Sequence, residues 1–291
     1  MKIINNHEPL PRFNPLNDYL FFKVMGEKGD EQQLIGFLNA VLGRSGKESI
    51  EAVEIIEDTS FVKNVLSGKS CILDILAVLQ DGTKVNIEVQ LSNKYNMERR
   101  SLFYWSKVYS ESLDEGQDYR KLPHVIAINI VDFDFPPEGD THTCFHLRED
   151  AELSLILSPV LEIHFVNMVK WRRQRDKDLE NDPLNRWLAW FDEESPPELI
   201  AEVTRMDSAI MAASERQYFV IQDEEARRAY WSIRKAEHDR VSNLNGAREE
   251  GQEEGRAEKA LEVARKMKGK GLPLEEIVDI TGLPTETIAE L

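Results

Sequence analysis

The sequence predicts an α/β fold, with a mixed central sheet flanked by helices and followed by a helical C-terminal region. Two observations support this prediction. Up to about residue 171, segments with the apolar pattern of β-strands alternate with segments of helical spacing. Beyond that point, apolar side chains recur three or four positions apart, which is typical of helices. The sheet is therefore expected in the first part of the sequence, and the helical region is expected to follow it.

Two helices are expected near the N-terminus. Asn17 precedes Leu20, Phe21 and Val24, which share helical spacing, and an Asn at this place can cap the first turn. The second helix is expected over residues 30–43, because it ends at a Gly, the residue that most often adopts the left-handed C-cap.

Six segments have the composition of strands. Some alternate apolar and polar residues, as strands with one buried face do. Residues 122–133 are almost continuously apolar, which suits a strand buried on both faces. A helix is expected at about residues 95–113, between the third and fourth strands. The strand segments are residues 50–59, 73–80, 83–90, 122–133, 142–147 and 160–168.

The composition of the chain argues against several classes of protein. The 291 residues carry a net charge of −17, and an acidic surface repels a polyanion, which argues against a protein that coats nucleic acid non-specifically. Two cysteines cannot form a disulfide framework, and the sequence shows neither a signal peptide nor an apolar run of about 18 residues. We therefore expect a cytoplasmic protein that does not bind a membrane.

The C-terminal part is expected to separate from the rest near residue 245. Residues 246–271 are rich in charged side chains and poor in apolar ones, which is typical of an exposed or partner-facing helix. The remaining residues have the pattern of two short helices around Gly282, similar to a helix-turn-helix. The chain is accordingly divided into residues 1–245 and a charged appendage, residues 246–291, whose helices are candidates for self-association.

The segment LDILAVLQDGTKVNIEVQ, residues 73–90, is expected to form a hairpin with Asp74 and Glu88 among apolar residues. A two-residue loop at its Asp-Gly turn would send the two carboxylates to opposite faces. A three-residue loop, with Gly82 in the left-handed conformation, would place them directly opposite each other. Gly is the residue that this second turn requires.

Paired carboxylates at these positions predict a metal site. Directly opposed residues have Cβ atoms about 4.5–5.5 Å apart, too close for two acids to stay ionised cheaply without a cation. Oxygen-only ligands favour Mg²⁺ or Mn²⁺, and the backbone carbonyl of Val89 is a further candidate ligand. An ion held by Asp74, Glu88 and Val89 would suit hydrolysis of a phosphodiester.

Five motifs follow one another along the chain: FNPLNDYLFFKVMG, LDIL, NIEVQ, RRSLFYWSKVYSESLDEGQDY and LPHVIAINIVDF. Together they resemble the PD-(D/E)XK nuclease superfamily and, more narrowly, the Rpn family of recombination-promoting nucleases, which are also described as transposases. The resemblance covers roughly residues 13–240. It implies a restriction-endonuclease-like sheet and a Mg²⁺-dependent DNA endonuclease. It also implies a role in recombination, mobile elements or defence.

Two positions depart from the superfamily pattern. Leu73 replaces its proline, a position that tolerates variation, and Gln90 replaces its lysine. A neutral amide can orient a water but cannot act as a base, so the resemblance leaves the general base unnamed. The Rpn-like family carries this Gln and keeps an acid at the position of Asp18. That carboxylate either binds the ion, directly or through water, or interacts with the helix dipole.

The helix that follows the hairpin is a candidate phosphate-binding element. Arg100, Tyr104 and Lys107 are spaced for one face, where they could contact a DNA backbone. The opposite face is expected to pack on the sheet. It consists of Leu102, Trp105, Tyr109 and Leu113.

Two other functions remain open. A catalytically silent nucleic-acid-binding or regulatory module would keep the fold without cleaving DNA. An oligomeric interaction protein would act through its charged C-terminal helix. The joint presence of Asp74, Glu88 and Gln90 favours the enzyme over both.

Two further features bear on possible sites. The basic run at residues 169–178 is a secondary candidate for phosphate contacts, with Trp171 stacking on an unpaired base. The six histidines show no metal-ligand spacing and predict no alternative site.

Overall fold

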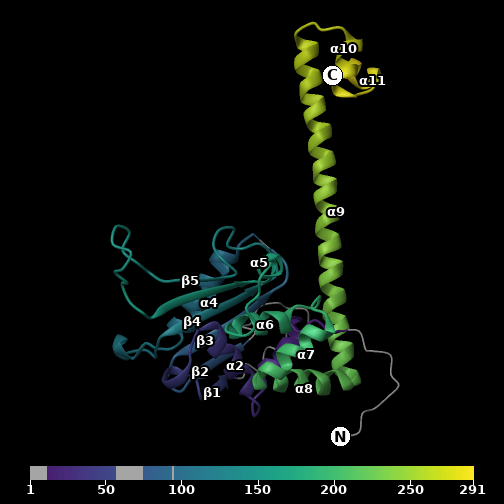
Figure 1. Ribbon diagram of the computed structural model, residues 1–291. Coiled ribbons are helices and arrows are strands. Elements are labelled where there is room, and N and C mark those ends of the chain that lie inside the picture. The colour runs from purple at the N-terminus through teal and green to yellow at the C-terminus, as the bar shows by residue number, and fades with distance from the viewer. Residues whose placement is uncertain (1–11, 57–74, 94) are drawn as a thin grey trace, which may run out of the picture. The chain divides into compact units, whose positions relative to one another are not determined.

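The computed structural model describes residues 12–56, 75–93 and 95–291 (Figure 1). The chain divides into two compact units, Met1–Ile233 and Arg234–Leu291. No helix among the described residues is both long and apolar enough to span a bilayer.

A six-stranded mixed sheet forms the centre of the first unit (Figure 1). Its strand order is β1-β2-β3-β4-β6-β5. Strands β3, β4 and β6 run parallel to one another, whereas β1, β2 and β5 are antiparallel to their neighbours. The strands are β1 (Val53–Ile56), β2 (Ile75–Leu79), β3 (Lys84–Gln90), β4 (Val125–Val131), β5 (His142–Phe145) and β6 (Leu161–Asn167). Every residue of β4 is buried, as its continuous apolar run predicts.

Helices lie on both faces of this sheet, which confirms the predicted fold class. The Asn17 side chain accepts a hydrogen bond from the Leu20 amide and caps α1, as expected. The helix predicted at residues 30–43 spans Gln32–Val41. The helices among the described residues of the first unit are α1 (Asp18–Met25), α2 (Gln32–Val41), α4 (Met97–Ser110), α5 (Met168–Arg173), α6 (Pro183–Phe191), α7 (Pro197–Met206), α8 (Ser208–Gln222) and the first part of α9 (Glu224–Gly269).

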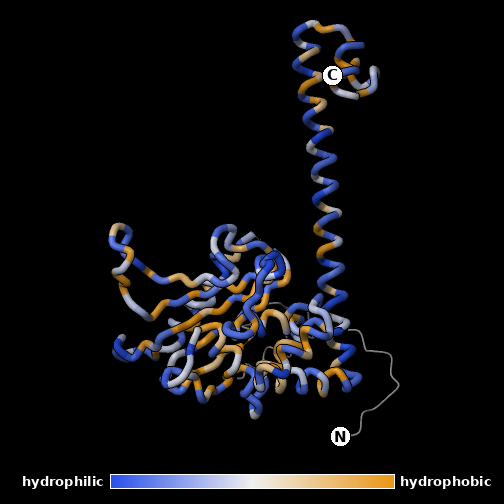
Figure 2. Tube along the Cα trace, viewed as in Figure 1, coloured by the Kyte–Doolittle hydropathy of each residue, from blue (hydrophilic) through white to orange (hydrophobic). Residues whose placement is uncertain are grey.

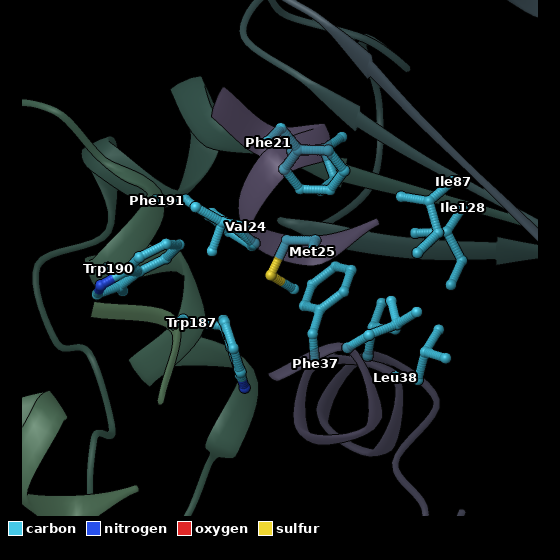
Figure 3. Packing of buried hydrophobic residues seen from close by; sticks show 14 of the residues in the cluster. Phe21, Val24, Met25, Phe37, Leu38, Ile87, Ile128, Trp187, Trp190 and Phe191 are labelled. Carbon is cyan, nitrogen blue, oxygen red and sulfur yellow. The ribbon is translucent and has the colours of Figure 1, made fainter. Parts of the chain in front are cut away.

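The larger core lies between one face of the sheet and helices α1, α2 and α6 (Figure 3). Phe37 packs edge-on against Trp187 and Phe191, with ring centroids 5.7 and 5.3 Å away. The sheet contributes Val85, Ile87 and Val89 to the same core, together with side chains of β2 and β4. Because Ile87 faces this core, its neighbour Glu88 points to the other face.

Helix α4 covers the second face. Its buried residues are Met97, Ser101, Tyr104 and Val108. The prediction that Leu102 packs on the sheet is wrong, because that side chain is 50% exposed. Trp105 does pack there, and its indole Nε1 donates a hydrogen bond to the Val125 carbonyl at 2.8 Å.

The second unit has its own small core. Helices α10 (Leu274–Thr281) and α11 (Thr285–Glu290) join at Gly282, whose φ of 68° gives the left-handed C-cap expected of this residue. Ala264, Ile277 and Ile288 are buried together. Figure 2 shows the middle of α9 as mostly hydrophilic, in agreement with the charged run in the sequence.

We expect Gly36→Ala to lower the free energy of unfolding by about 1–3 kcal/mol. Gly36 lies in α2 where that helix meets α8, and a Cβ there would lie 2.2 Å from the Ala209 Cβ. The loss would occur although Ala is favoured over Gly inside a helix by roughly 1 kcal/mol. Urea unfolding followed by tryptophan fluorescence measures the change, with Gly251→Ala as the matched control because a Cβ there meets no atom within 4 Å. Equal stability of both variants would contradict the close approach.

Candidate active site

The β2–β3 hairpin closes with the three-residue loop. The Leu79 amide donates to the Thr83 carbonyl at 2.8 Å, and the Gly82 amide donates to the Leu79 carbonyl at 2.9 Å. Gly82 has a φ of 84°, the left-handed conformation that the bulged turn requires. The hairpin therefore has the register that the three-residue loop predicts, and the two-residue alternative is wrong.

The described part of this ladder ends with Ile75 opposite Ile87. Asp74 lies outside the described residues, so its pairing with Glu88 stays a prediction.

Glu88 is a buried carboxylate beneath α4. Only 1% of its side chain is exposed, and its Oε2 accepts a hydrogen bond from the Arg100 Nη2 at 3.2 Å. The Arg100 guanidinium also lies 5.0 Å from the centroid of the Tyr104 ring. The fold thus brings together three of the residues proposed from the sequence, whereas Lys107 is exposed on the outer side of α4.

Gln90 and Val89 contact each other at the end of β3. The Gln90 Nε2 donates to the Val89 carbonyl at 2.6 Å, while the Val89 side chain is buried in the larger core. The role of the Val89 carbonyl as a metal ligand stays a prediction.

Other buried polar residues surround Glu88 on this face. Asn129 lies opposite Glu88 in the β3–β4 register and donates to the His164 carbonyl at 3.1 Å. Asn86, two residues before Glu88, is 1% exposed, and its Oδ1 has no hydrogen-bond partner among the described residues. A buried acceptor in this state is costly unless a ligand satisfies it. Strand alternation puts Asn86 on the same face of β3 as Glu88, and this position is the one sign of the residue that the sequence carries.

Asp18 is the first residue of α1 and is half-buried. It follows the Asn17 cap, where a carboxylate interacts favourably with the helix dipole. Its role in metal binding stays a prediction.

An ion-pair network links the end of β3 to its neighbours. The Asp132 amide donates to the Gln90 carbonyl at 2.9 Å, and the Asp132 carboxylate pairs with Arg172. Arg172 Nε also donates to Asp192 at 2.8 Å. Burial alone would lower the pKa of Arg172, but its hydrogen bonds to the two carboxylates outweigh burial and raise it. Hydrogen bonds to both carboxylates therefore hold Arg172 next to the strand end that carries Gln90.

The secondary prediction for Trp171 is wrong. Its side chain is 2% exposed within the larger core, and its Nε1 donates to Asn185 at 3.0 Å. A buried indole cannot stack on a base. The basic run around it is partly used in ion pairs, including Arg173 with Asp134 at 3.1 Å.

Comparison with known protein families gives one match. The family model described as PD-(D/E)XK nuclease family transposase matches residues 15–247. Comparison with curated proteins and with solved structures finds no match. The matched range contains α1, the hairpin and α4, the elements that carry the candidate site.

Proposed function

Because the chain belongs to the PD-(D/E)XK nuclease family transposases, we propose that it is a metal-dependent endonuclease that hydrolyses phosphodiester bonds in DNA. The observation that supports this proposal most directly is the burial of Glu88 beside Arg100 beneath α4. Keeping a carboxylate out of water is costly, and buried charges with a specific partner concentrate at functional sites. The hairpin of β2 and β3 is the proposed active centre.

The oxygen donors near Glu88 suit a hard divalent cation. They include its own carboxylate, the Val89 carbonyl and the buried Oδ1 of Asn86. We assign Asp74, Glu88 and the Val89 carbonyl as ligands of Mg²⁺ or Mn²⁺. Such an ion, when bound, neutralises charge on the phosphate and positions the attacking water.

The remaining side chains orient the substrates. Gln90 donates through Nε2 to the Val89 carbonyl, and its amide oxygen is the group proposed to accept a hydrogen bond from the attacking water. Asp18 binds the ion directly or through water. Arg100 offers a planar fork for phosphate oxygens, supported by Tyr104, and the exposed Lys107 adds a point charge along the backbone.

The proposed wider role is supported by the same family membership. DNA is the proposed substrate, in the cytoplasm, and recombination, mobile-element transfer or defence is the proposed setting. Residues 1–245 form the proposed nuclease part. The appendage, residues 246–291, is proposed to mediate self-association, because the part of α9 that it contains is highly charged and mostly exposed.

Plasmid cleavage by the purified full-length protein tests the proposal. Supercoiled DNA should be nicked or linearised with Mg²⁺ or Mn²⁺ and should stay intact with chelator. Asp74→Ala and Glu88→Ala should fold and leave the plasmid intact. An inert wild-type protein that still binds DNA would favour the catalytically silent module instead.

A further inference from the structure

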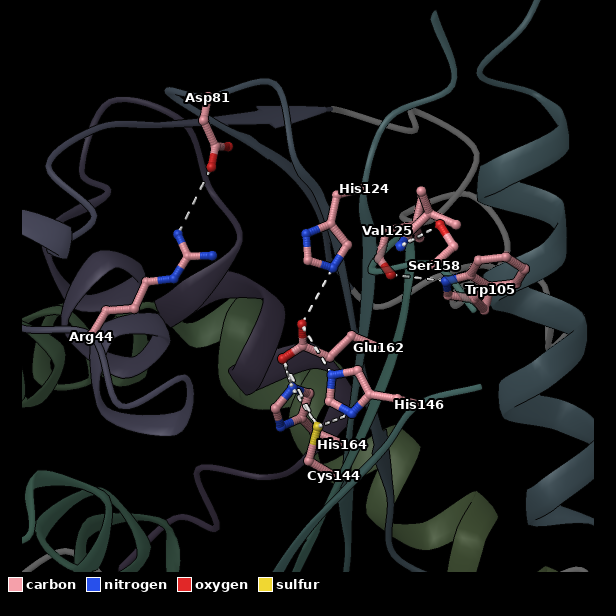
Figure 4. Close-up of polar contacts among 11 residues, drawn as sticks. Arg44, Asp81, Trp105, His124, Val125, Cys144, His146, Ser158, Glu162 and His164 are labelled. Carbon is pink, nitrogen blue, oxygen red and sulfur yellow. Dashed lines mark hydrogen bonds and ion pairs between the residues drawn. The ribbon is translucent and has the colours of Figure 1, made fainter. Parts of the chain in front are cut away.

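A second group of metal-ligating side chains lies outside the hairpin, on the β5–β6 pair (Figure 4). The antiparallel register places Cys144 opposite His164. Alternation along the two strands then brings His146 and Glu162 to the same face. The histidines show no metal-ligand spacing along the sequence, but the β5–β6 register brings His146 and Glu162 close to Cys144.

Three of these side chains have donor atoms close enough to share one ion. Cys144, His146 and Glu162 each offer a ligand atom, and the three atoms lie within 4.8 Å of one another. The Cys144 Sγ is 3.7 Å from His146 Nδ1 and 3.9 Å from Glu162 Oε1. Ligands about 2.0–2.3 Å from a tetrahedral ion are about 3.3–3.8 Å apart, so only small side-chain shifts are needed.

The charge around Glu162 also suits a cation. Among the described residues its ion pairs involve histidines alone, at 3.2 Å from His124, 2.7 Å from His164 and 4.0 Å from His146. A carboxylate at 20% side-chain exposure with no lysine or arginine partner is available to a metal ion.

Further histidines hold the carboxylate in place. His164 Nε2 lies 2.7 Å from Glu162 Oε1, and its Nδ1 lies 2.8 Å from His142 Nε2. The two rings stack with centroids 5.1 Å apart. Metal ligands in proteins are oriented by such outer hydrogen-bond partners, which fix their direction and raise their affinity.

We propose that Cys144, His146 and Glu162 bind Zn²⁺, with the fourth position open to water and with His164 and His142 orienting Glu162. A thiolate, an imidazole and a carboxylate together favour Zn²⁺, whereas the oxygen donors of the hairpin favour Mg²⁺ or Mn²⁺. Binding converts the Cys144 thiol to a thiolate and releases its proton to solvent. The site depends on none of the residues assigned to the nuclease.

Cobalt titration of the purified full-length protein, monitored by absorption, tests this site. One equivalent of Co²⁺ should produce a thiolate-to-cobalt charge-transfer band, and Zn²⁺ should abolish it by displacement. Cys144→Ser should lose the band, and His146→Ala should weaken Zn²⁺ binding at least about tenfold. Cys71→Ser is the matched control and should keep the band, because Cys71 is the other thiol of the chain.

Cys144 is exposed on an edge strand, so its replacement should leave the circular dichroism spectrum unchanged. Glu88→Gln should also retain the cobalt band, whether or not the protein cleaves DNA, which separates this inference from the proposed nuclease activity. Absence of the band in wild type, or its survival in Cys144→Ser, would overturn the assignment.

Discussion

Glu88→Gln is expected to reduce metal-dependent plasmid cleavage about a thousandfold, a loss of about 4 kcal/mol of transition-state stabilisation. Glu and Gln have nearly the same shape, so the packing beneath α4 is preserved. The amide, however, carries no charge and binds a hard cation far more weakly than a carboxylate does. The initial rate of supercoiled plasmid loss at saturating Mg²⁺ measures the effect.

The control for this prediction is the same Glu-to-Gln change at an exposed position of α4, the helix that covers Glu88. Glu98 is exposed in the first turn of α4, and Glu98→Gln should cut at the wild-type rate. Asp74→Asn should match the loss seen for Glu88→Gln, because both acids are assigned to one ion. Wild-type activity in Glu88→Gln would remove the hairpin as the active centre, and wild-type activity in Asp74→Asn alone would remove Asp74 as a ligand.

The hairpin was predictable because its geometry depends on neighbours in sequence. Gly82 tolerates the positive φ that a three-residue loop needs, and the loop length then fixes every pair along the two strands. The burial of β4 was also predictable. A strand that is covered on both faces has apolar residues at nearly every position, and the sequence shows this almost continuous apolar run.

The packing of helices on the sheet and the register of strands that are not joined by a short turn were not predictable, because both depend on contacts between residues far apart in the sequence. Helical spacing shows which residues of α4 lie on one face of the helix. Which face is buried depends on how the helix packs on the sheet, and in the structure Tyr104 is buried while Leu102 is exposed. The cluster of Cys144, His146 and Glu162 was not predictable for the same reason. Its alternating residues were visible in two expected strands, yet only the β5–β6 register places Cys144 beside His164.

Arg100→Met is expected to lower the free energy of unfolding by about 3 kcal/mol when metal is removed by chelator. Met keeps most of the length of the side chain but not its charge, so the carboxylate of Glu88, 1% exposed, loses the guanidinium that it now contacts. Added Mg²⁺ should restore part of the stability, because a cation that binds the folded protein at this carboxylate shifts the equilibrium toward it. Urea unfolding with and without Mg²⁺ measures both effects.

The double variant Glu88→Gln with Arg100→Met separates the ion pair from simple loss of packing. Since it removes the charges on both sides, its loss should be smaller than the sum of the two single losses by roughly 1 kcal/mol or more. Mg²⁺ should stabilise Arg100→Met but not the double variant, which lacks the proposed ligand. Equal stabilisation of both would place the ion away from Glu88, and strictly additive losses would show that Arg100 contributes through packing rather than through its charge.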